Sequence, residues 1–518
     1  MRIDPRLLDG RTFDLVVVGA GIQGAAIARD AALRGLAVLL VDRRDVAAGT
    51  SSRSSRLVHG GLRYLRHGHF ALVREALQER ERLLRSCPFL VRPVPMLLPS
   101  FDGDGASRWA MRLGTWLYAW LAGRSTLPRP RSLSSRDAAL AFPGLRTKGL
   151  RSAIEYFDAA TQDARLTLAN VRSAHAAGAA IATHVEVVGH GDGGLRLLDR
   201  LREDESTVRA RHVVNAAGPH VDRVRRTCGI EAAELVRTTR GSHLVLAPRA
   251  GELALAAFLP DRRIQFVIPH RDGTLCGTTD VDNALSGDET GPPRDDVEYL
   301  LQALQFVLDP APTRADVRFA YAGWRALPKV AGPAGALNRE AFVIAEPIAD
   351  GTLHTVVGGK LTTHRSLAER TVARIFGLRE PSPTRTLALP GGAGPREVTD
   401  ALWWRHGHEA HAVRALARQQ PELLQALCPH RPFLAVELVH ALRVEGAVRF
   451  ADVLLRRLVH SQGPCREPAC LRAAHALFVA HRALPVDDDA AAAIAALLAE
   501  LRTLCGDLQL PAVVADPV

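Results

Sequence analysis

The most constraining feature of the chain is a glycine-rich turn near its start. Residues 14–24 read Asp-Leu-Val-Val-Val-Gly-Ala-Gly-Ile-Gln-Gly, and a second apolar run ends on Asp42. A strand, a glycine turn, a helix of small residues and a second strand that ends in a carboxylate form the βαβ pattern of a dinucleotide site. Gly19 permits the tight turn, Gly21 lets the backbone approach a pyrophosphate, and Gly24 lets the helix pack against the strand. The helix N-terminus favours phosphates and Asp42 is placed to bind a ribose hydroxyl, so the turn predicts a dinucleotide site without saying which dinucleotide.

The composition is that of a globular protein with a basic balance. The chain has 518 residues, 47% of them apolar and 23% charged. On a prior of roughly 150 residues a domain, this length predicts about three domains. Lys and Arg outnumber Asp and Glu 66 to 55, a net charge of +11. The excess favours acidic partners such as phosphorylated substrates, anionic lipid or nucleic acid, and does not choose among them.

Targeting and metal-binding signals are weak. No cleavable signal peptide precedes the first strand, and no run approaches the roughly 18 apolar residues that span a bilayer. We therefore expect a cytoplasmic protein. The seven cysteines include no Cys-x-x-Cys pair, and the spacing from Cys465 to Cys470 is not typical of a metal or iron–sulfur site. We interpret the cysteines as reduced structural thiols and predict no metal site.

Periodicity divides the rest of the chain. Residues 70–85 are predicted to form an amphipathic helix. Residues 181–199 alternate around a Gly-Asp-Gly-Gly turn, which favours a hairpin, and 211–219 form a buried strand that runs into a small-residue turn. After Pro390 the sequence becomes rich in Ala, Leu and Arg with helical periodicity, so we place a domain boundary near 388.

A loop rich in hydroxyls and glycine follows Asp42. Residues 49–65 read Gly-Thr-Ser-Ser-Arg-Ser-Ser-Arg-Leu-Val-His-Gly-Gly-Leu-Arg-Tyr-Leu. Such a loop can surround a phosphate or a polar ring with short donors, and by composition alone it could also be an ordinary flexible loop. In this order it resembles the family of FAD-dependent (aerobic, quinone-linked) glycerol-3-phosphate dehydrogenases.

The resemblance continues along the chain in the same order. It covers Asp158 and the segments 163–166 (Asp-Ala-Arg-Leu), 213–219 (Val-Val-Asn-Ala-Ala-Gly-Pro), 241–243 (Gly-Ser-His), 277–280 (Gly-Thr-Thr-Asp), 321–325 (Tyr-Ala-Gly-Trp-Arg), 358–363 (Gly-Gly-Lys-Leu-Thr-Thr) and the helical 437–457. It departs from the family in four places, namely Ala326 instead of proline, Arg240 instead of lysine, His364 instead of tyrosine and His270 instead of tryptophan. These departures put the details of substrate binding in question more than cofactor binding.

The resemblance implies an α/β fold with three domains. The first is a Rossmann-like FAD-binding domain of the D-amino-acid-oxidase and glycerol-3-phosphate-dehydrogenase type, expected at 1–85, 150–235 and 345–388. A mixed-sheet substrate-binding domain is expected at 86–149 and 236–344. An all-helical C-terminal domain is expected at 389–518, where its helices would support dimerisation or partner docking, or only cap the fold.

The same resemblance assigns the cofactor and its contacts. It implies FAD, with the glycine turn holding the ADP half and the late turn at 358–363 leading into a helix under the flavin. The expected cofactor-binding residues are Gly19, Gly21, Gly24, Asp42, Thr50, Ser51, Ser52, His59, Gly60, Gly61, Ala217, Gly218, Gly359, Lys360, Leu361 and Thr362.

Oxidation of a secondary alcohol sets the remaining requirements. The reaction needs a hydride acceptor, which a flavin provides, and a base that takes the hydroxyl proton. His243 is the best candidate base, because histidine alone has an unperturbed pKa near working pH. Guanidinium groups hold a phosphate well, since they present matched donors and keep their charge. The resemblance points to Arg325 as a second catalytic residue and to Arg63, Tyr64, Arg339 and Lys360 as substrate phosphate-binding residues.

The segment 108–124 raises the question of membrane contact. Its helical periodicity places Trp109, Leu113, Trp116, Leu117 and Trp120 on one face, and arginines flank them. Such a helix can lie in a membrane interface, and it can equally bury its aromatic stripe in a core. With the family resemblance, we expect a peripheral protein on the inner face of the cytoplasmic membrane, with an anionic membrane surface as a partner.

The expected reaction is oxidation of sn-glycerol 3-phosphate to dihydroxyacetone phosphate, with hydride transfer to flavin N5 and electrons passed to a membrane quinone. Two alternatives remain: a glycerol-3-phosphate oxidase that uses O2, and an amine or amino-acid oxidase of the same superfamily. Nucleic-acid binding is not expected, because the chain has no basic run studded with aromatics. NADP is disfavoured because Asp42 would repel a 2′-phosphate. A homodimer is left open.

Overall fold

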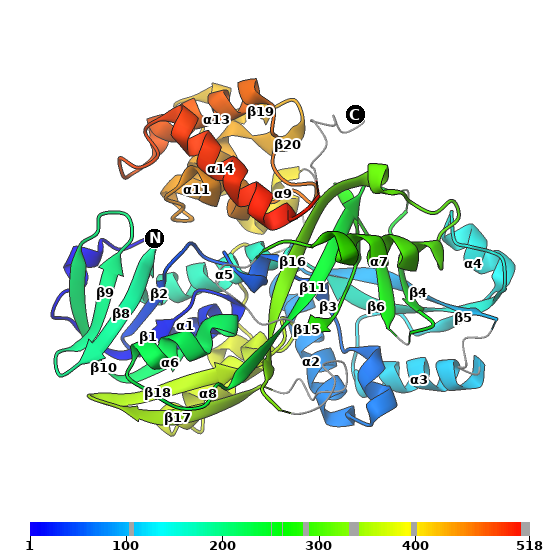
Figure 1. Cartoon of the computed structure of the whole chain (residues 1–518), viewed down its shortest axis with the longest axis horizontal. Coiled ribbons are helices and arrows are strands. Elements are labelled where there is room, and N and C mark those ends of the chain that lie inside the picture. The colour runs from blue at the N-terminus through cyan, green and yellow to red at the C-terminus, as the bar shows by residue number, and fades with distance from the viewer. Residues whose placement is uncertain are drawn as a thin grey trace.

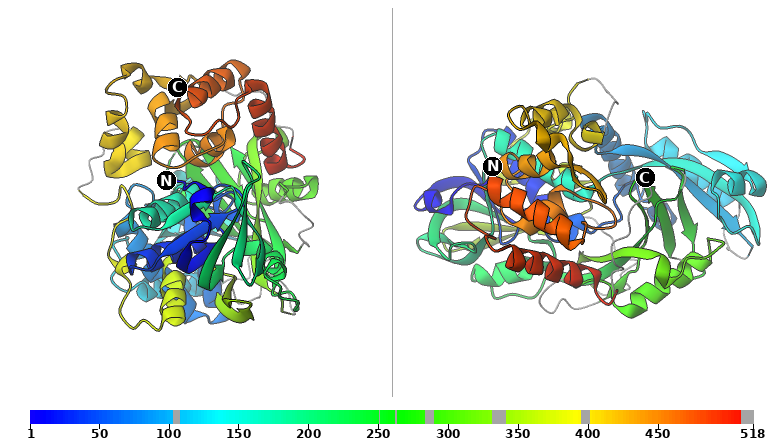
Figure 2. Two further views of the ribbon diagram at one scale, coloured as in Figure 1. Left: turned by 90° about the vertical axis from the view of Figure 1, so that its left-hand side faces the viewer. Right: turned by 90° about the horizontal axis from the view of Figure 1, so that it is seen from above.

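The computed structural model describes residues 1–102, 108–249, 251–261, 263–282, 290–330, 341–394 and 401–508. Two large sheets lie side by side, and the C-terminal helices cover them from one side (Figures 1 and 2). Among the helices in these ranges, none is long and apolar enough to cross a bilayer.

The first sheet carries the glycine turn. Its main path runs β17-β18-β10-β1-β2-β7, and the hairpin β8–β9 is attached to β10. Strands β1, β2, β7, β10 and β18 pair in parallel, and β17 is antiparallel to β18. The bounds are β1 (Thr12–Val18), β2 (Val38–Asp42), β7 (Ala180–Thr183), β8 (Val185–Gly191), β9 (Gly194–Asp199), β10 (Glu205–Asn215), β17 (Phe342–Ile348) and β18 (Gly351–Val357).

Helix α1 (Ile22–Leu33) packs on this sheet between α5 (Asp163–Ala176) and α8 (His364–Phe376). Its buried face consists mainly of alanines, so the helix axis can approach the apolar strands closely. At Gly24 a Cβ would collide with the carbonyl oxygen of Gly19. Gly19 itself has a φ of 109°, a conformation that a residue with a Cβ rarely adopts. The expected βαβ unit is therefore present, and its glycines are required by close packing.

The second sheet is mixed and runs β15-β11-β14-β13-β12-β4-β6-β3, with β16 paired to β11 and β5 to β6. Its bounds are β3 (Leu57–Val58), β4 (Arg92–Phe101), β5 (Arg131–Ser134), β6 (Leu150–Ala160), β11 (Val236–Leu246), β12 (Ala254–Phe258), β13 (Ile264–His270), β14 (Gly273–Gly277), β15 (Val281–Asp282) and β16 (Val317–Pro328). Helices α2 (Phe70–Ser86), α3 (Arg108–Leu121), α4 (Ser135–Ala141) and α7 (Arg294–Gln305) contact this second sheet, whereas α6 (Val221–Thr227) packs on β8, β10 and β18 of the first. Since β6 pairs with β4, we propose to move the domain boundary expected at 150 to the end of β6.

The C-terminal part is helical, as expected, apart from one short hairpin. The two strands β19 (Ala426–Cys428) and β20 (Arg431–Leu434) pair around a turn at Pro429 and His430. The helical elements are α9 (Ala401–His406), α10 (Ala410–Ala415), α11 (Ala435–Arg443), α12 (Phe450–Asp452), the π-helical turn η10 (Val453–Arg457), α13 (Pro468–His481) and α14 (Ala490–Cys505). Phe450 and Phe478 share one apolar cluster with residues of the second sheet, so this domain packs on the sheet as part of one core.

A buried ion-pair network fixes the C-terminal domain to the first sheet. Asp45, in the loop after β2, accepts hydrogen bonds from Arg456 at 2.9 Å and from Arg457 at 2.7 Å. All three side chains are at most 7% exposed. Removing one partner of a buried pair leaves the other charge desolvated and uncompensated.

We therefore predict a large loss of stability on Asp45→Asn. The free energy of unfolding should fall by about 3–5 kcal/mol, because two buried guanidinium groups lose their shared carboxylate. Urea denaturation measures the change. Glu298→Gln is the matched control, because its ion pair with Arg294 is exposed and should contribute about 0–1 kcal/mol. Equal stabilities of the two variants would contradict the role of Asp45.

Candidate functional site

A cavity of about 950 Å³ is lined by residues of both sheets. This volume is at the upper end for ligand pockets, as an extended dinucleotide requires. Most of the expected site residues line it: Gly19, Gly21, Asp42, Thr50, Ser51, His59, Gly61, Tyr64, Ala217, Gly218, His243, Arg325, Gly359, Lys360, Leu361 and Thr362. Gly24, Ser52 and Gly60 are not among the lining residues. Arg339 and the side chain of Arg63 fall outside what the structure describes.

One end of the cavity is formed by the glycine turn. The backbone N–H of Ile22, at the start of α1, donates to the hydroxyl of Ser51 at 2.9 Å. The carboxylate of Asp42 accepts from the N–H of Ala20 at 2.7 Å and from that of Arg44 at 2.8 Å. Burial raises the pKa of Asp42. A carboxylate accepts about four hydrogen bonds, so Asp42 retains capacity for a ribose hydroxyl.

The middle of the cavity is formed by two loops that hold each other. The N–H of His59 donates to the hydroxyl of Thr362 at 3.1 Å, and this hydroxyl lies 3.3 Å from the carbonyl oxygen of His59. The hydroxyl of Thr50 donates to the carbonyl of Trp324 at 2.7 Å, which ties the first loop to β16. Gly61 and Gly359 have φ values of 77° and 102°, and a Cβ at either would press on a neighbouring side chain. The two loops therefore present backbone and short side chains to the cavity.

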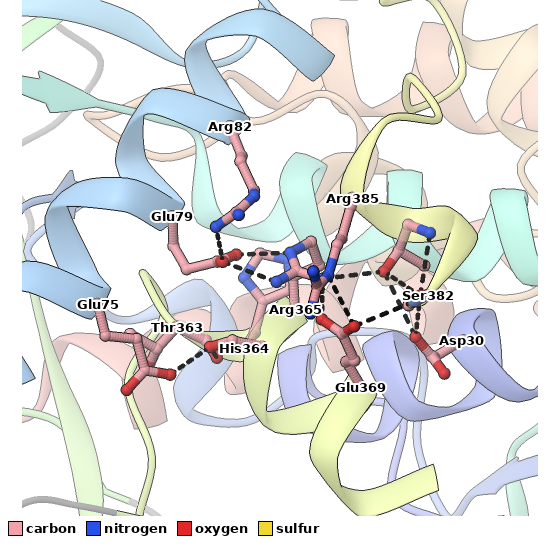
Figure 3. Close-up of polar contacts among 12 residues, drawn as sticks. Asp30, Glu75, Glu79, Arg82, Thr363, His364, Arg365, Glu369, Ser382 and Arg385 are labelled. Carbon is pink, nitrogen blue, oxygen red and sulfur yellow. Dashed lines mark hydrogen bonds and ion pairs between the residues drawn. The ribbon is translucent and has the colours of Figure 1, made fainter. Parts of the chain in front are cut away.

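The turn at 358–363 is held in place by the helix that follows it. Figure 3 shows Arg365, in the first turn of α8, reaching Glu79 of α2. The Nε and one terminal nitrogen of Arg365 donate to this carboxylate, at 2.6 and 2.7 Å. Arg365 also donates to Glu369 at 2.8 Å. In the turn itself, the Lys360 ammonium lies 3.8 Å from the centre of the Tyr64 ring. The network thus fixes the turn that carries Lys360.

The other end of the cavity lies on the paired strands β11 and β16. Register places His243 opposite Tyr321, Gly241 opposite Gly323, and Thr239 opposite Arg325. Alternation puts these residues on one face of the sheet. The rings of His243 and Tyr321 stack with centroids 5.0 Å apart. A Cβ at Gly241 would collide with the Arg325 guanidinium, so the glycine makes room for this cation on the same face as His243.

His243 is buried, and two nearby arginines affect its pKa. Its Nε2 shares a hydrogen bond of 2.8 Å with the hydroxyl of Ser55. Burial, and then the charges of Arg325 and Arg56, lower the pKa of His243 to about 3. The imidazole is therefore neutral at physiological pH and has the protonation state that a proton acceptor requires.

Arg325 is held in a fixed orientation. Its guanidinium donates to Asp280 at 2.8 Å, to the carbonyl of Thr279 at 3.2 Å and to the hydroxyl of Thr278 at 3.1 Å. These contacts orient the guanidinium, whose positive charge favours an anion in the cavity. Arg325 lines the cavity together with His243 and Lys360.

Two residues near His243 were not singled out from the sequence. Ser55 bonds the imidazole, and Arg56 lies with its guanidinium 5.9 Å from the centre of the Tyr321 ring. Both belong to the 49–65 loop, whose residue order resembles that of the family. Their position beside His243 depends on pairing between segments 188 residues apart, which no local pattern reveals. By contrast, His364 bonds the carbonyl of Leu361 at 2.6 Å and does not line the cavity.

Comparison with known proteins identifies the class. A family model for FAD-dependent oxidoreductases matches residues 14–365, and one for the C-terminal domain of alpha-glycerophosphate oxidase matches 353–467. A structure of the glycerol-3-phosphate dehydrogenase from Bacillus halodurans complexed with FAD superposes with a TM-score of 0.74, 26% identity and 97% coverage of both chains. The fold and the cavity are those of an FAD-dependent oxidoreductase, and FAD is the cofactor.

The relatives narrow the class further. The chain is 36% identical over 496 residues to a glycerol-3-phosphate dehydrogenase of Synechocystis, covering 87% of this chain and 89% of that protein. A glycerol-3-phosphate dehydrogenase of Mycobacterium leprae is 36% identical over 498 residues, with 89% and 83% covered. A D-erythritol 1-phosphate dehydrogenase of Brucella abortus is 37% identical over 400 residues, with 74% and 78% covered. The chain belongs to the FAD-dependent glycerol-3-phosphate dehydrogenase family.

Proposed function

We propose that this protein oxidises sn-glycerol 3-phosphate to dihydroxyacetone phosphate and passes the electrons to a membrane quinone. The observation that carries the proposal is the meeting of His243, Arg325 and Lys360 in the cavity that also contains the dinucleotide turn. A neutral base and fixed cations are what a phosphorylated alcohol needs, because its phosphate is held while its hydroxyl loses a proton.

The proposed step divides the work among these residues. Arg325 and Lys360 bind the phosphate, and Tyr64 lies beside Lys360. His243 accepts the proton of the substrate hydroxyl, and the hydrogen bond between its Nε2 and Ser55 orients the ring. When bound, FAD supplies the hydride acceptor at N5. The C–H bond and the O–H bond break, the carbonyl forms, and two electrons and a proton leave as hydride.

Assays with several substrates test this assignment. The protein should form dihydroxyacetone phosphate from sn-glycerol 3-phosphate with an artificial electron acceptor. D-erythritol 1-phosphate is the specific rival, since the Brucella relative is about as similar as the others. Glycine tests the amino-acid oxidase alternative. A higher kcat/KM for either compound than for sn-glycerol 3-phosphate would overturn the proposed substrate.

We place the acceptor in the membrane because of α3. On this helix Trp109, Leu113, Trp116 and Trp120 are 61–76% exposed, while Tyr118 on the opposite face is buried. The aromatic stripe is therefore not packed in the core, and an exposed apolar stripe on a helix is suited to a membrane interface.

The helix is also linked to the cavity. The Tyr118 hydroxyl accepts from the N–H of Gly60 at 2.7 Å and donates to Asp158 at 2.9 Å, so the exposed helix is joined to the 49–65 loop.

A measurement of peroxide during turnover distinguishes a quinone from O2 as the electron acceptor. Turnover with a quinone and without peroxide supports the proposal, and stoichiometric peroxide would favour the oxidase.

Removing two of the exposed tryptophans should strongly weaken membrane binding. We expect Trp116→Ser combined with Trp120→Ser to lose most co-sedimentation with anionic vesicles while flavin content is unchanged, because each large aromatic contributes about 1.5–3 kcal/mol on burial. Leu7→Ser is the control, since Leu7 is also 67% exposed but lies outside α3. Unchanged binding of the double variant would contradict the interfacial role of α3.

A further inference from the structure

Four side chains with metal-binding atoms meet in the C-terminal domain. The ligand atoms of Cys428, His430, Cys465 and Cys470 all lie within 4.8 Å of one another. Cys428 and Cys465 are buried, and the other two are half-buried. The Nδ1 of His430 lies 3.5 Å from the sulfur of Cys465 and 3.5 Å from that of Cys470.

The two nitrogen–sulfur separations match a tetrahedral zinc site. With Zn–S near 2.3 Å and Zn–N near 2.0–2.1 Å, tetrahedral angles place a sulfur and a nitrogen about 3.5 Å apart and two sulfurs about 3.8 Å apart. Three cysteines and one histidine are a common ligand set of structural zinc. The set fills all four positions, which is the arrangement of a structural site and leaves no position for a substrate.

Two segments supply the ligands. Cys428 and His430 lie at the turn of the β19–β20 hairpin, and Cys465 and Cys470 flank the start of α13. Arg431 holds the segments together, since its Nε donates to the carbonyl of Gly463 at 3.0 Å. We predicted no metal site from the sequence because the cysteines include no Cys-x-x-Cys pair and the spacing from Cys465 to Cys470 is not typical of a metal site. The prediction did not include His430, which lies 35 residues before Cys465.

Two other buried clusters lack this character. His406, His440 and Glu445 form one, and Asp45, His184 and Asp452 form the other. In each, arginines already bond the carboxylates, through Arg165 on Glu445 and Arg456 on Asp45. These guanidinium groups already neutralise the carboxylates that a metal ion would otherwise bind. Both clusters are therefore explained as ion-pair networks.

We propose that Cys428, His430, Cys465 and Cys470 bind one structural Zn²⁺. Three thiol protons pass to solvent on binding, the cysteines bind as thiolates, and His430 binds through Nδ1 as the neutral imidazole. No electron is transferred.

The site would fix a loop that bonds Arg56, whose neighbour Ser55 lines the cavity. Between η10 and Cys465, the hydroxyl of Ser461 accepts from Arg56 at 2.7 Å and donates to Asp272 at 2.7 Å. Arg56 in turn lies beside Tyr321. Zinc would therefore hold the segment that places Arg56 near His243, in addition to stabilising the C-terminal domain.

Metal analysis of the full-length flavoprotein tests the proposal. We expect about one zinc per chain after purification without chelators, and zinc K-edge absorption that gives three sulfur neighbours near 2.3 Å and one nitrogen. Cys470→Ser and His430→Ala should each lose most of the zinc. Cys228→Ser is the control, because Cys228 is a buried thiol in α6's C-terminal turn and should leave the zinc content unchanged.

Three results would overturn the proposal. They are a protein that neither contains zinc nor takes up added Zn²⁺, a disulfide between two of these cysteines in protein prepared under reducing conditions, and zinc with an oxygen-rich ligand set. The absorption spectrum of the wild-type protein decides even where a variant does not fold. Because zinc content is measured without turnover, its outcome is independent of the proposed substrate.

Discussion

His243→Gln is expected to lower kcat by about 10²–10⁴-fold, which is the usual contribution of a general base. A glutamine amide can keep a hydrogen bond with Ser55 but cannot accept a proton. Flavin absorbance of the purified variant should equal that of the wild type, because the dinucleotide end of the cavity is remote in sequence and structure. His190→Gln, in the β8–β9 hairpin, is the control. A loss smaller than about threefold would remove His243 from the proton-transfer step.

The pH profile gives a second readout for His243. The pKa of His243 is about 3 in the free protein, lowered by burial first and then by Arg325 and Arg56. Since a base is active when neutral, and the neutral form dominates above this pKa, His243 should cause no acid limb in kcat/KM above pH of about 5. Removing the charge at Arg325 removes a cause of the lowering, so the pKa of His243 should rise in Arg325→Gln.

Arg325→Lys is expected to lower kcat/KM for sn-glycerol 3-phosphate by about 10–100-fold, with much of the change in KM. Lysine keeps the charge but loses the planar fork, and a hydrogen bond to a charged group contributes about 1.5–3 kcal/mol. The preference for glycerol 3-phosphate over glycerol should fall in parallel, because only the phosphorylated compound uses the cation. Steady-state kinetics with both compounds measure this ratio.

Arg318→Lys is the matched control for this substitution. Arg318 lies on the same strand, β16, but is not among the residues that line the cavity. Its replacement should leave both kinetic constants unchanged. If Arg325→Lys lowers the activity with glycerol as strongly as with glycerol 3-phosphate, the guanidinium does not select the phosphate.

Local patterns predicted the elements whose structure depends on neighbouring residues. The helix expected at 70–85 is α2 (Phe70–Ser86), the hairpin expected within 181–199 is β8–β9, and the glycine turn joins β1 to α1. Each depends on periodicity or on turn chemistry that a short segment contains. We propose a later boundary than 150 because β6 pairs with β4, and this pairing is a long-range contact with no local signature.

The exposure of α3 shows a different limit. Its sequence has one aromatic face and one face with Met111 and Tyr118, and periodicity alone does not tell which face meets the core. The structure buries Tyr118 because its hydroxyl bonds Asp158 and Gly60. The spacing from Cys465 to Cys470 was likewise visible in the sequence, but the convergence of these residues with Cys428 and His430 follows only from the packing of the hairpin on α13.

We propose that sn-glycerol 3-phosphate reduces the flavin in this cavity. Anaerobic addition of stoichiometric sn-glycerol 3-phosphate to the purified flavoprotein measures it directly through the visible flavin absorption. We predict that the band bleaches, and that glycerol and glycine at the same concentration leave it unchanged. A band that persists with excess sn-glycerol 3-phosphate, but disappears on addition of dithionite, would contradict the account.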